Sequence, residues 1–378
     1  FNATARMNGP IDNPQFSGRA IASTPLAVDN LTFSNAATDF FLQGDQLSLD
    51  NIAGTLNTGG SLQGNGQVRL SQGTPFTFQL AGRNLPADDI GEIYGLQSDF
   101  AIGLVSADAT VVGNDGNVFT TVDWNAPNAQ YPGSGTVDIT NGTDLFFRDT
   151  VFALGGGTAS GSGSLIGEFW DGDVTLQNVQ LNAFSPDLRG DVNGQFQFSG
   201  TTADTRIGAI KAIGDIAFSD GLSAFSSQFD SFNQPLSAQV TWNGEKIQVI
   251  QANSGRLTAN GTLTPSFDRG FTGLESFDLA VNATDYAIAE LPFPIPDVLD
   301  LSGRTDVAGR LTGSPTAPNF SGDLQLRELV VNSLAFTSQL AGTVDYTTLG
   351  GLALNVAGGA DRIALTAGPF ETDSDETA

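Results

Sequence analysis

The sequence predicts an all-β chain, and three observations support this prediction. Apolar and polar residues alternate with a period of two along most of the 378 residues, as in Phe76-Thr-Phe-Gln-Leu80, which is the pattern of strands with one apolar and one polar face. Turn sequences such as Asn65-Gly66 and Asn243-Gly244 interrupt this alternation about every ten residues. Glycine accounts for 46 residues, well above the usual ~7%. We expect roughly 30 to 40 short strands and under about 10% helix.

Two short segments have a helical pattern. Residues 86–94 begin with proline and carry Asp88 and Asp89 in the first turn, where acidic side chains favour a helix N-terminus. Residues 285–291 are followed by three prolines within the next five positions, which end a helix. Each segment is expected to form one or two turns at a junction between strands.

Internal repetition organises the chain. A Gly-rich strand pattern occurs at 60–66, 157–163 and 255–261, and a second pattern with glycines ten residues apart occurs at 188–200 and 301–313. No Pro/Ser-rich linker separates the copies. We therefore expect one continuous repetitive β array over 1–378, an interior segment of a longer protein built from units of about 100 residues. The approximate repeat units are 1–103, 104–190, 191–303 and 304–378.

Composition and charge exclude several function classes. The chain has no Cys and no His, and its 41 acidic residues outnumber 15 basic ones, for a net charge of −26. Chemistry that needs a Cys nucleophile, a zinc finger or a His general base is excluded. Nucleic acid is not expected as a partner, because no basic footprint exists to replace phosphate counterions. The acidic surface and the absence of Cys are typical of an exported protein, and no signal peptide or transmembrane run is visible.

The sequence offers few candidates for chemistry, and structural interpretations are favoured for them. Residues 114–117 (Asn-Asp-Gly-Asn) are interpreted as a turn, because a calcium loop needs more carboxylates at fixed spacing. Asp88 and Asp89 are explained by a helix N-terminus rather than by acid/base catalysis. The Gly-rich stretch 155–163 lacks the Lys-Ser/Thr of a phosphate loop. We expect no enzyme activity, no cofactor and no metal site.

Several motifs in a consistent order resemble a known family. The marks are Gly-Gly-x-Leu-x-Gly-x-Gly at 59–66, Phe-x-Leu at 78–80, Leu-x-Gly followed by Gly at 301–309, and Pro-x-Phe-Ser-Gly at 318–322. Together they resemble the TamB family of the AsmA-like superfamily (the translocation and assembly module), and residues 291–336 are most similar to its cyanobacterial and chloroplast-envelope branch. The typical N-terminal anchor and C-terminal domain of that family are absent from this chain.

This resemblance implies a fold, a location and partners. The fold would be an elongated, strongly curved antiparallel or mixed sheet forming a β-taco, which is an open trough with an apolar inside. The protein would lie in the periplasm or intermembrane space, tethered to the inner membrane by a segment absent here. It would contact an outer-membrane barrel of the TamA/BamA superfamily through parts outside this segment. Its function would be phospholipid transport, outer-membrane protein assembly, or both.

An open groove is expected mainly from this resemblance and from the missing linkers, because alternation alone is also the pattern of a closed core. An apolar trough lowers the cost of exposing acyl chains to water, about 0.8 kcal/mol per CH₂. Its occupant is either phospholipid acyl chains or unfolded outer-membrane protein segments. Two alternatives are an adhesin-like array of filled β-domains and a β-helix acting on polysaccharide. The residues expected to line the groove are Phe78, Leu80, Val137, Ile139, Val174, Leu176, Phe196, Phe198, Trp242, Val249, Phe277 and Leu279.

Overall fold

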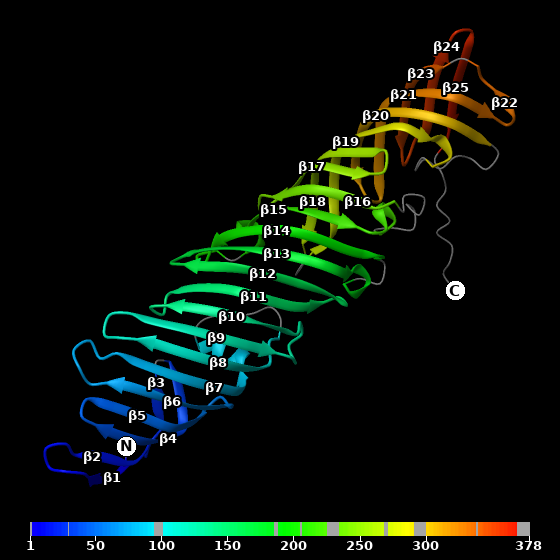
Figure 1. The fold of residues 1–378 in the computed structure, drawn as a ribbon. Helices are drawn as coiled ribbons and strands as arrows, with labels where there is room; N and C mark the ends of the chain where they lie inside the picture. The colour runs from blue at the N-terminus through cyan, green and yellow to red at the C-terminus, as the bar shows by residue number, and fades with distance from the viewer. Residues whose placement is uncertain are drawn as a thin grey trace, which may run out of the picture. The chain divides into compact units, whose positions relative to one another are not determined.

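A computed structural model describes residues 2–28, 30–93, 101–184, 188–204, 206–224, 234–267, 271–290, 300–337 and 339–368 (Figure 1). The structure is 72% strand and 5% helix, and its 25 strands form an open antiparallel sheet. The prediction of an all-β chain with under about 10% helix is therefore confirmed. The chain divides into two compact units, Phe1–Val174 and Thr175–Ala378, with the division inside one strand.

The first unit is an antiparallel meander. Strands follow one another in the sheet, except that β2 also pairs directly with β4. Its elements are β1 (Asn2–Asn8), β2 (Gln15–Ile21), β3 (Leu26–Val28), β4 (Leu31–Gln43), β5 (Gln46–Leu56), β6 (Ser61–Arg69), β7 (Phe76–Pro86), α1 (Ala87–Ile93), β8 (Leu104–Gly113), β9 (Val118–Ala126), β10 (Gly133–Thr140), β11 (Asp144–Leu154), β12 (Gly157–Ile166) and the first half of β13 (Phe169–Gln180).

The second unit continues the same pattern, with β21 pairing directly with β23 across the short β22. Its elements after β13 are η1 (Leu181–Ala183), β14 (Asp191–Thr201), η2 (Ile207–Ala209), β15 (Lys211–Phe218), η3 (Gly221–Ala224), β16 (Leu236–Trp242), β17 (Ile247–Ser254), β18 (Leu257–Phe267), β19 (Phe271–Ala287), η5 (Ile288–Glu290), β20 (Leu301–Ser314), β21 (Ala317–Val331), β22 (Leu334–Ala335), β23 (Leu340–Thr347), β24 (Gly351–Gly358) and β25 (Asp361–Ala367).

One of the two expected helical segments forms as predicted. Helix α1 occupies most of 86–94, and Tyr94 lies outside the described residues. The second expectation, 285–291, is wrong in its first half. Tyr286 and Ala287 pair with Thr305 and Arg304 of β20, so the strand runs on to Ala287 and only one 3₁₀ turn follows. Cross-strand pairing outweighs the weak helical preference of this segment. Leu291 lies outside the described residues.

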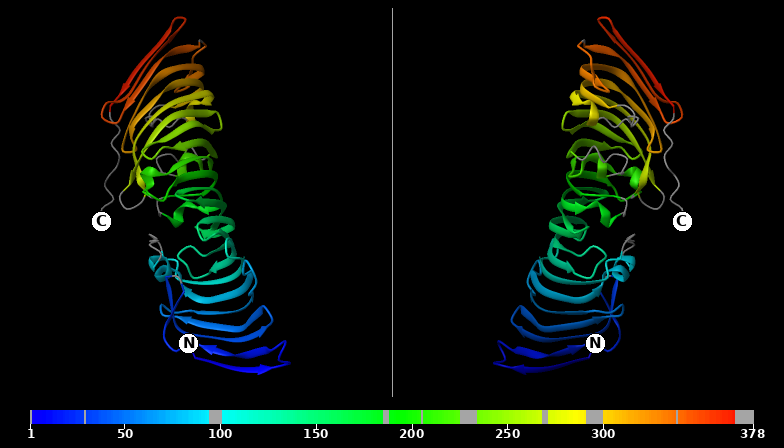
Figure 2. Two further views of the ribbon diagram at one scale, coloured as in Figure 1. Left: turned by 90° about the vertical axis from the view of Figure 1, so that its left-hand side faces the viewer. Right: turned by 90° about the vertical axis from the view of Figure 1, so that its right-hand side faces the viewer.

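Bulges interrupt the ladder at matching places. In β5, two residues between Leu49 and Ile52 stand opposite one residue of β6, and β11 has the same arrangement between Phe147 and Thr150. A third bulge lies between Val249 and Ala252 in β17. Each bulge faces one of the Gly-rich segments, and a bulge bends its strand. The strands of each unit are bent into arcs (Figure 2).

Glycines of the Gly-rich strands lie against neighbouring strands too closely for a side chain. A Cβ added at Gly64 would lie 2.2 Å from the carbonyl oxygen of Gln79, and one at Gly161 would lie 2.0 Å from that of Asp173. A Cβ at Gly66 would instead meet the ring of Phe78 at 2.2 Å. Glycine thus permits close backbone approach at Gly64 and Gly161. At Gly66 it gives the phenyl ring of Phe78 room to lie across the strand.

Burial differs between the two units. Among the described residues, the buried apolar side chains of the first unit are Phe33, Leu56, Ala126 and Ala159. The second unit contains a larger closed cluster over β19–β24, in which Leu340 is fully buried and Val356 is 1% exposed. The described part of the first unit therefore leaves more of its sheet accessible to water than the second unit does.

Candidate functional site

The register places four of the expected groove residues on one face of the first unit. Phe78 pairs with Val111, which pairs with Thr120, which pairs with Ile139. One row further along, Leu80 leads through Ala109 and Val122 to Val137. Directly paired residues of an antiparallel sheet share a face. Phe78, Leu80, Val137 and Ile139 therefore lie on the same face, which we call the apolar face of this unit.

The face on which Val174 lies is inferred from the contacts of its neighbours on β13. The Ser162 hydroxyl donates to the carboxylate of Asp173 at 2.7 Å, and the Ser164 hydroxyl donates to Asp171. Ser164 pairs with Phe146, on the opposite face from Phe147 and Gly163. Alternation along the strand then assigns Val174 to the apolar face. Leu176 follows two residues later on the same side of the strand.

In the second unit, the other six expected residues share one face. Phe198 leads through Ala212, Trp242, Ile247 and Leu263 to Phe277, and Phe196 leads through Gly214, Val240, Val249 and Gly261 to Leu279. These two adjacent rows form the apolar face of the second unit. The rings of Phe196 and Phe198 lie side by side, with centroids 5.9 Å apart.

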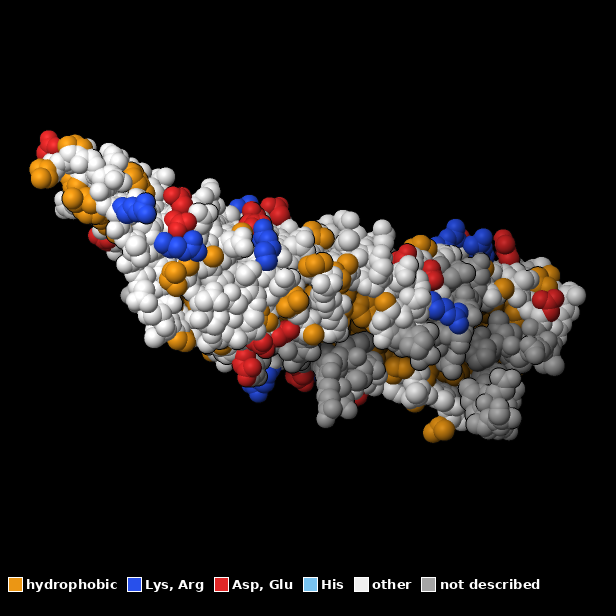
Figure 3. Space-filling view, turned by 90° about the horizontal axis from the view of Figure 1, so that it is seen from below, with side chains coloured by type: hydrophobic (Ala, Val, Ile, Leu, Met, Phe, Trp, Pro, Cys, Tyr) orange, Lys and Arg blue, Asp and Glu red, His pale blue; other side chains and the backbone are white. Residues whose placement is uncertain are grey.

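Exposure on these faces is graded. Eleven of the twelve expected residues are half-buried, and Val249 is buried at 5% exposure. On the side of the molecule drawn in Figure 3, apolar side chains reach the surface in many places, interspersed with acidic and basic side chains. Over β20–β24, in contrast, the row through Leu279 and Leu311 reaches the buried Phe320, and Leu324 further along β21 is also buried, so the apolar face is closed there.

The opposite face is polar and carries ion pairs. On β10, the Asp138 carboxylate accepts from Arg148 Nε at 2.7 Å and from the Thr121 hydroxyl at 2.7 Å. The hydrogen bond from Arg148 and then that from Thr121 lower the pKa of Asp138 below its ordinary value. These contacts span three adjacent strands and leave the carboxylate ionised, so they bind the strands together on their water-facing side.

The candidates for chemistry have structural roles. The Asn114 side chain accepts from the backbone N–H groups of Gly116 and Asn117 at 3.0 and 3.1 Å, which is the geometry of an Asx turn. Asp88 accepts from the backbone N–H groups of Ile102 and Gly103, which lowers its pKa and ties α1 to the segment before β8. Across the described ranges, no group of three acidic, Cys or His side chains is arranged to hold a metal ion.

A hollow of about 580 Å³ lies on the second unit, and residues of both faces of the sheet line it. Its lining includes the cross-strand row Gln195, Asp215, Gln239 and Gln251. Gln195, Asp215 and Gln239 lie on the polar face, because each is next to a residue of the apolar rows, and Gln251 pairs with Gln239. Leu176, Ile216 and Ala238 also line the hollow, so it offers amide and carboxylate groups beside apolar side chains.

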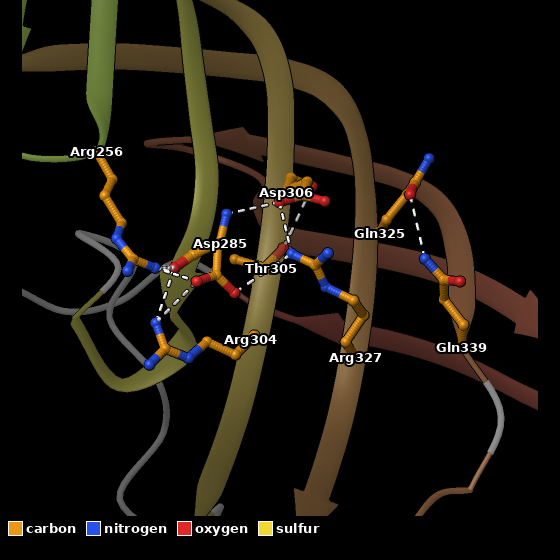
Figure 4. A network of polar contacts seen from close by, with 8 residues as sticks. All are labelled: Arg256, Asp285, Arg304, Thr305, Asp306, Gln325, Arg327 and Gln339. Atoms are coloured by element: carbon orange, nitrogen blue, oxygen red, sulfur yellow. Dashed lines mark hydrogen bonds and ion pairs between the residues drawn. The ribbon is translucent and has the colours of Figure 1, made fainter.

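Sequence reasoning missed a cluster of three arginines around one aspartate (Figure 4). Nη1 of both Arg256 and Arg304 donates to the backbone carbonyl and the carboxylate of Asp285. Nη2 of Arg327 lies 2.8 Å from Asp306 and 3.5 Å from Asp285. The hydrogen bond from Arg256 is the main cause that lowers the pKa of Asp285. The sequence did contain a signal for this cluster, because arginine is scarce in the chain and yet three arginines lie within 304–327 and another stands at 256.

Comparison with known proteins found no matching family model, no matching curated protein and no matching solved structure. In the part of the chain that the structure describes, no helix has the length and apolar character needed to cross a membrane.

Proposed function

We propose that this chain is a segment of an envelope bridge protein whose apolar sheet face carries acyl chains, or unfolded outer-membrane protein segments, between two membranes. The observation that supports this proposal is the pair of half-buried apolar rows in each unit, such as Phe78 to Ile139 in the first. Side chains that alternate so regularly and yet remain half-exposed are expected of an open β-taco, in which the ligand completes the burial.

The small number of buried residues favours an open trough over filled domains. A β-sandwich covers its inner face with a second sheet and buries the alternating residues of both. In the described part of the first unit, only four apolar side chains are buried, whereas Phe78, Leu80, Val137 and Ile139 stay half-exposed. Each acyl CH₂ that moves from water onto such a surface contributes about 0.8 kcal/mol. A smooth apolar face thus carries chains of varied length without a specific site.

The matching bulges and glycines support the β-taco. The bulges of β5 and β11 face the first two Gly-rich segments, and both contain a residue of left-handed backbone conformation, Asn51 with φ 53° and Asp149 with φ 52°. Bending at equivalent points keeps the apolar face concave along successive strands. We infer that the units of about 100 residues are built around these bends. The location between two membranes and the barrel partner belong to the same proposal.

Site-specific photo-crosslinking tests the proposal. Benzoylphenylalanine is placed at Leu80 on the apolar face or at the adjacent Gln79 on the polar face, with Phe198 and Gln197 as the matching pair in the second unit. The purified chain is irradiated with phospholipid vesicles or with an unfolded outer-membrane protein, and adducts are identified by mass spectrometry. We expect adducts at Leu80 and Phe198 and few at Gln79 and Gln197. Equal labelling of both faces, or labelling of neither, would contradict the proposal.

A further inference from the structure

The arginine cluster of the second unit has a charge balance unlike the rest of the chain. Arg256, Arg304 and Arg327 contribute three positive charges, and Asp285 and Asp306 contribute two negative ones. These five mutually bonded side chains therefore carry an excess of one positive charge, in a chain of net charge −26. The exposed Glu328 follows Arg327 in the chain but joins none of these contacts.

Much of the donor capacity of this cluster is unused. A guanidinium has five N–H groups in a planar fork. In the described ranges, Arg256 and Arg304 each donate through Nη1 alone, and both direct it to Asp285. Among the described residues, Nε and Nη2 of both arginines have no protein acceptor, and these side chains are 54% and 45% exposed. Two accessible guanidinium forks are thus held beside each other by a single carboxylate.

The surrounding backbone holds this arrangement in place. Asp285 lies in a bulge of β19 with φ 52°, and its backbone N–H donates to the Asp306 carboxylate at 2.6 Å. Asp306 in turn accepts from Arg327 at 2.8 Å. Thr305, next to Asp306, is fully buried on the apolar side of β20. The aspartate that gathers the arginines is therefore anchored by a closed part of the sheet, so the forks are positioned before any ligand arrives.

We propose that Arg256 and Arg304 form a binding site for a phosphate-type oxyanion. Paired guanidinium forks match the geometry of phosphate oxygens, and hydrogen bonds to ionised groups are stronger than neutral ones. Arg304 lies three residues after Leu301, where β20 begins, and on the face opposite the core row of Tyr286, Thr305 and Leu326. For a phospholipid bound here, the acyl chain would pass around the start of β20 to meet the apolar face. This lipid assignment rests on the proposed function, whereas binding of free phosphate does not.

The test compares the complete chain with a double variant, Arg256→Gln with Arg304→Gln. The control is Arg310→Gln with Arg362→Gln, which removes the same charge outside the cluster, since Arg310 pairs with Asp278. A second variant, Arg256→Lys with Arg304→Lys, keeps the charge and removes the forks. Thermal melts establish that each variant is folded. The probes are inorganic phosphate at constant ionic strength, dodecylphosphocholine, and dodecyl maltoside, which has the same chain without a phosphate, both detergents below micelle formation.

We expect the glutamine variant to lose about threefold to tenfold in affinity for dodecylphosphocholine, with the lysine variant in between and the control unchanged. Binding of dodecyl maltoside should be equal in all four proteins. If only inorganic phosphate distinguishes the variants, the site takes free phosphate and the lipid assignment fails. If neither detergent binds any of the proteins, the proposed function fails while the phosphate titration still decides on the anion site. Equal affinity of all four proteins for phosphate and for dodecylphosphocholine would overturn the inference.

Discussion

Replacing Gly64 by alanine should destabilise the first unit more than the same change at Gly66, two residues further along β6. A Cβ at Gly64 would lie 2.2 Å from the carbonyl oxygen of Gln79 and 3.1 Å from Cα of Leu80, both in the backbone of β7. A Cβ at Gly66 would lie 2.2 Å from a ring carbon of Phe78. A phenyl ring rotates away, whereas a backbone carbonyl moves only if the two strands separate.

The size of the difference follows from these contacts. Separating β6 from β7 by about 1 Å costs about 1–3 kcal/mol of packing strain and about 1 kcal/mol for each weakened ladder hydrogen bond. Alanine also restricts the unfolded chain more than glycine does, and this stabilises the folded state by about 0.4–1 kcal/mol. We expect a net loss of about 2–3 kcal/mol for Gly64→Ala. For Gly66→Ala we expect a loss of less than about 1 kcal/mol. An off-rotamer phenyl ring costs about 0.5–1.5 kcal/mol, and the effect of alanine on the unfolded chain offsets part of this cost.

Thermal melts followed by circular dichroism measure this difference. At about 2–4 °C per kcal/mol for a domain of this size, Gly64→Ala should lower the melting midpoint by about 4–12 °C and Gly66→Ala by less than about 4 °C. Gly161→Ala, whose Cβ would lie 2.0 Å from the Asp173 carbonyl oxygen, should behave like Gly64→Ala. An unchanged midpoint for Gly64→Ala, or a larger loss at Gly66, would refute the close-approach argument.

Three further predictions concern the groove, the ion pairs and the fold. Val137→Asp should keep the fold and abolish acyl binding, because a carboxylate at this half-buried position stays hydrated. Val356, at 1% exposure, is the comparison, and Val356→Asp should lower the free energy of unfolding by roughly 2–7 kcal/mol. Thermal melts and binding assays with a fluorescent fatty acid check both variants, and unfolding of Val137→Asp would count against an open groove. Hydrogen bonds from Arg206 lower the pKa of Asp204 from 3.8 to about 2. The ionised pair therefore stabilises the fold at pH values above about 3.8, and this stability is lost as the pH falls through about 2. Arg206→Gln should return the pKa of Asp204 toward 3.8 in a carboxyl NMR titration, and an unchanged pKa would disprove the pairing. The far-ultraviolet circular dichroism spectrum should show strand with under about 10% helix, and a spectrum dominated by helix would contradict the fold.

Secondary structure and the assignment of residues to faces were largely determined by the sequence. A strand has a side-chain period of two, so alternation in Phe76-Thr-Phe-Gln-Leu80 directly assigns Phe78 and Leu80 to one side. Turn sequences such as Asn243-Gly244 then separate β16 from β17 without reference to distant contacts. The shortened helix after Asp285 shows where local preference was insufficient, since pairing with β20 extends β19 to Ala287.

Burial and side-chain clustering were decided only by tertiary structure. Alternation gives Val249 and Val137 the same apolar label, yet Val249 is 5% exposed and Val137 is half-buried. Val249 lies at the bulge of β17, and such a bulge depends on the pairing between strands. The arginine cluster has the same origin, because Arg256 reaches Asp285 only when β18 and β19 are in register and Arg327 reaches it only across β20. Contacts of this kind join residues that are distant in the chain, so no local pattern encodes them.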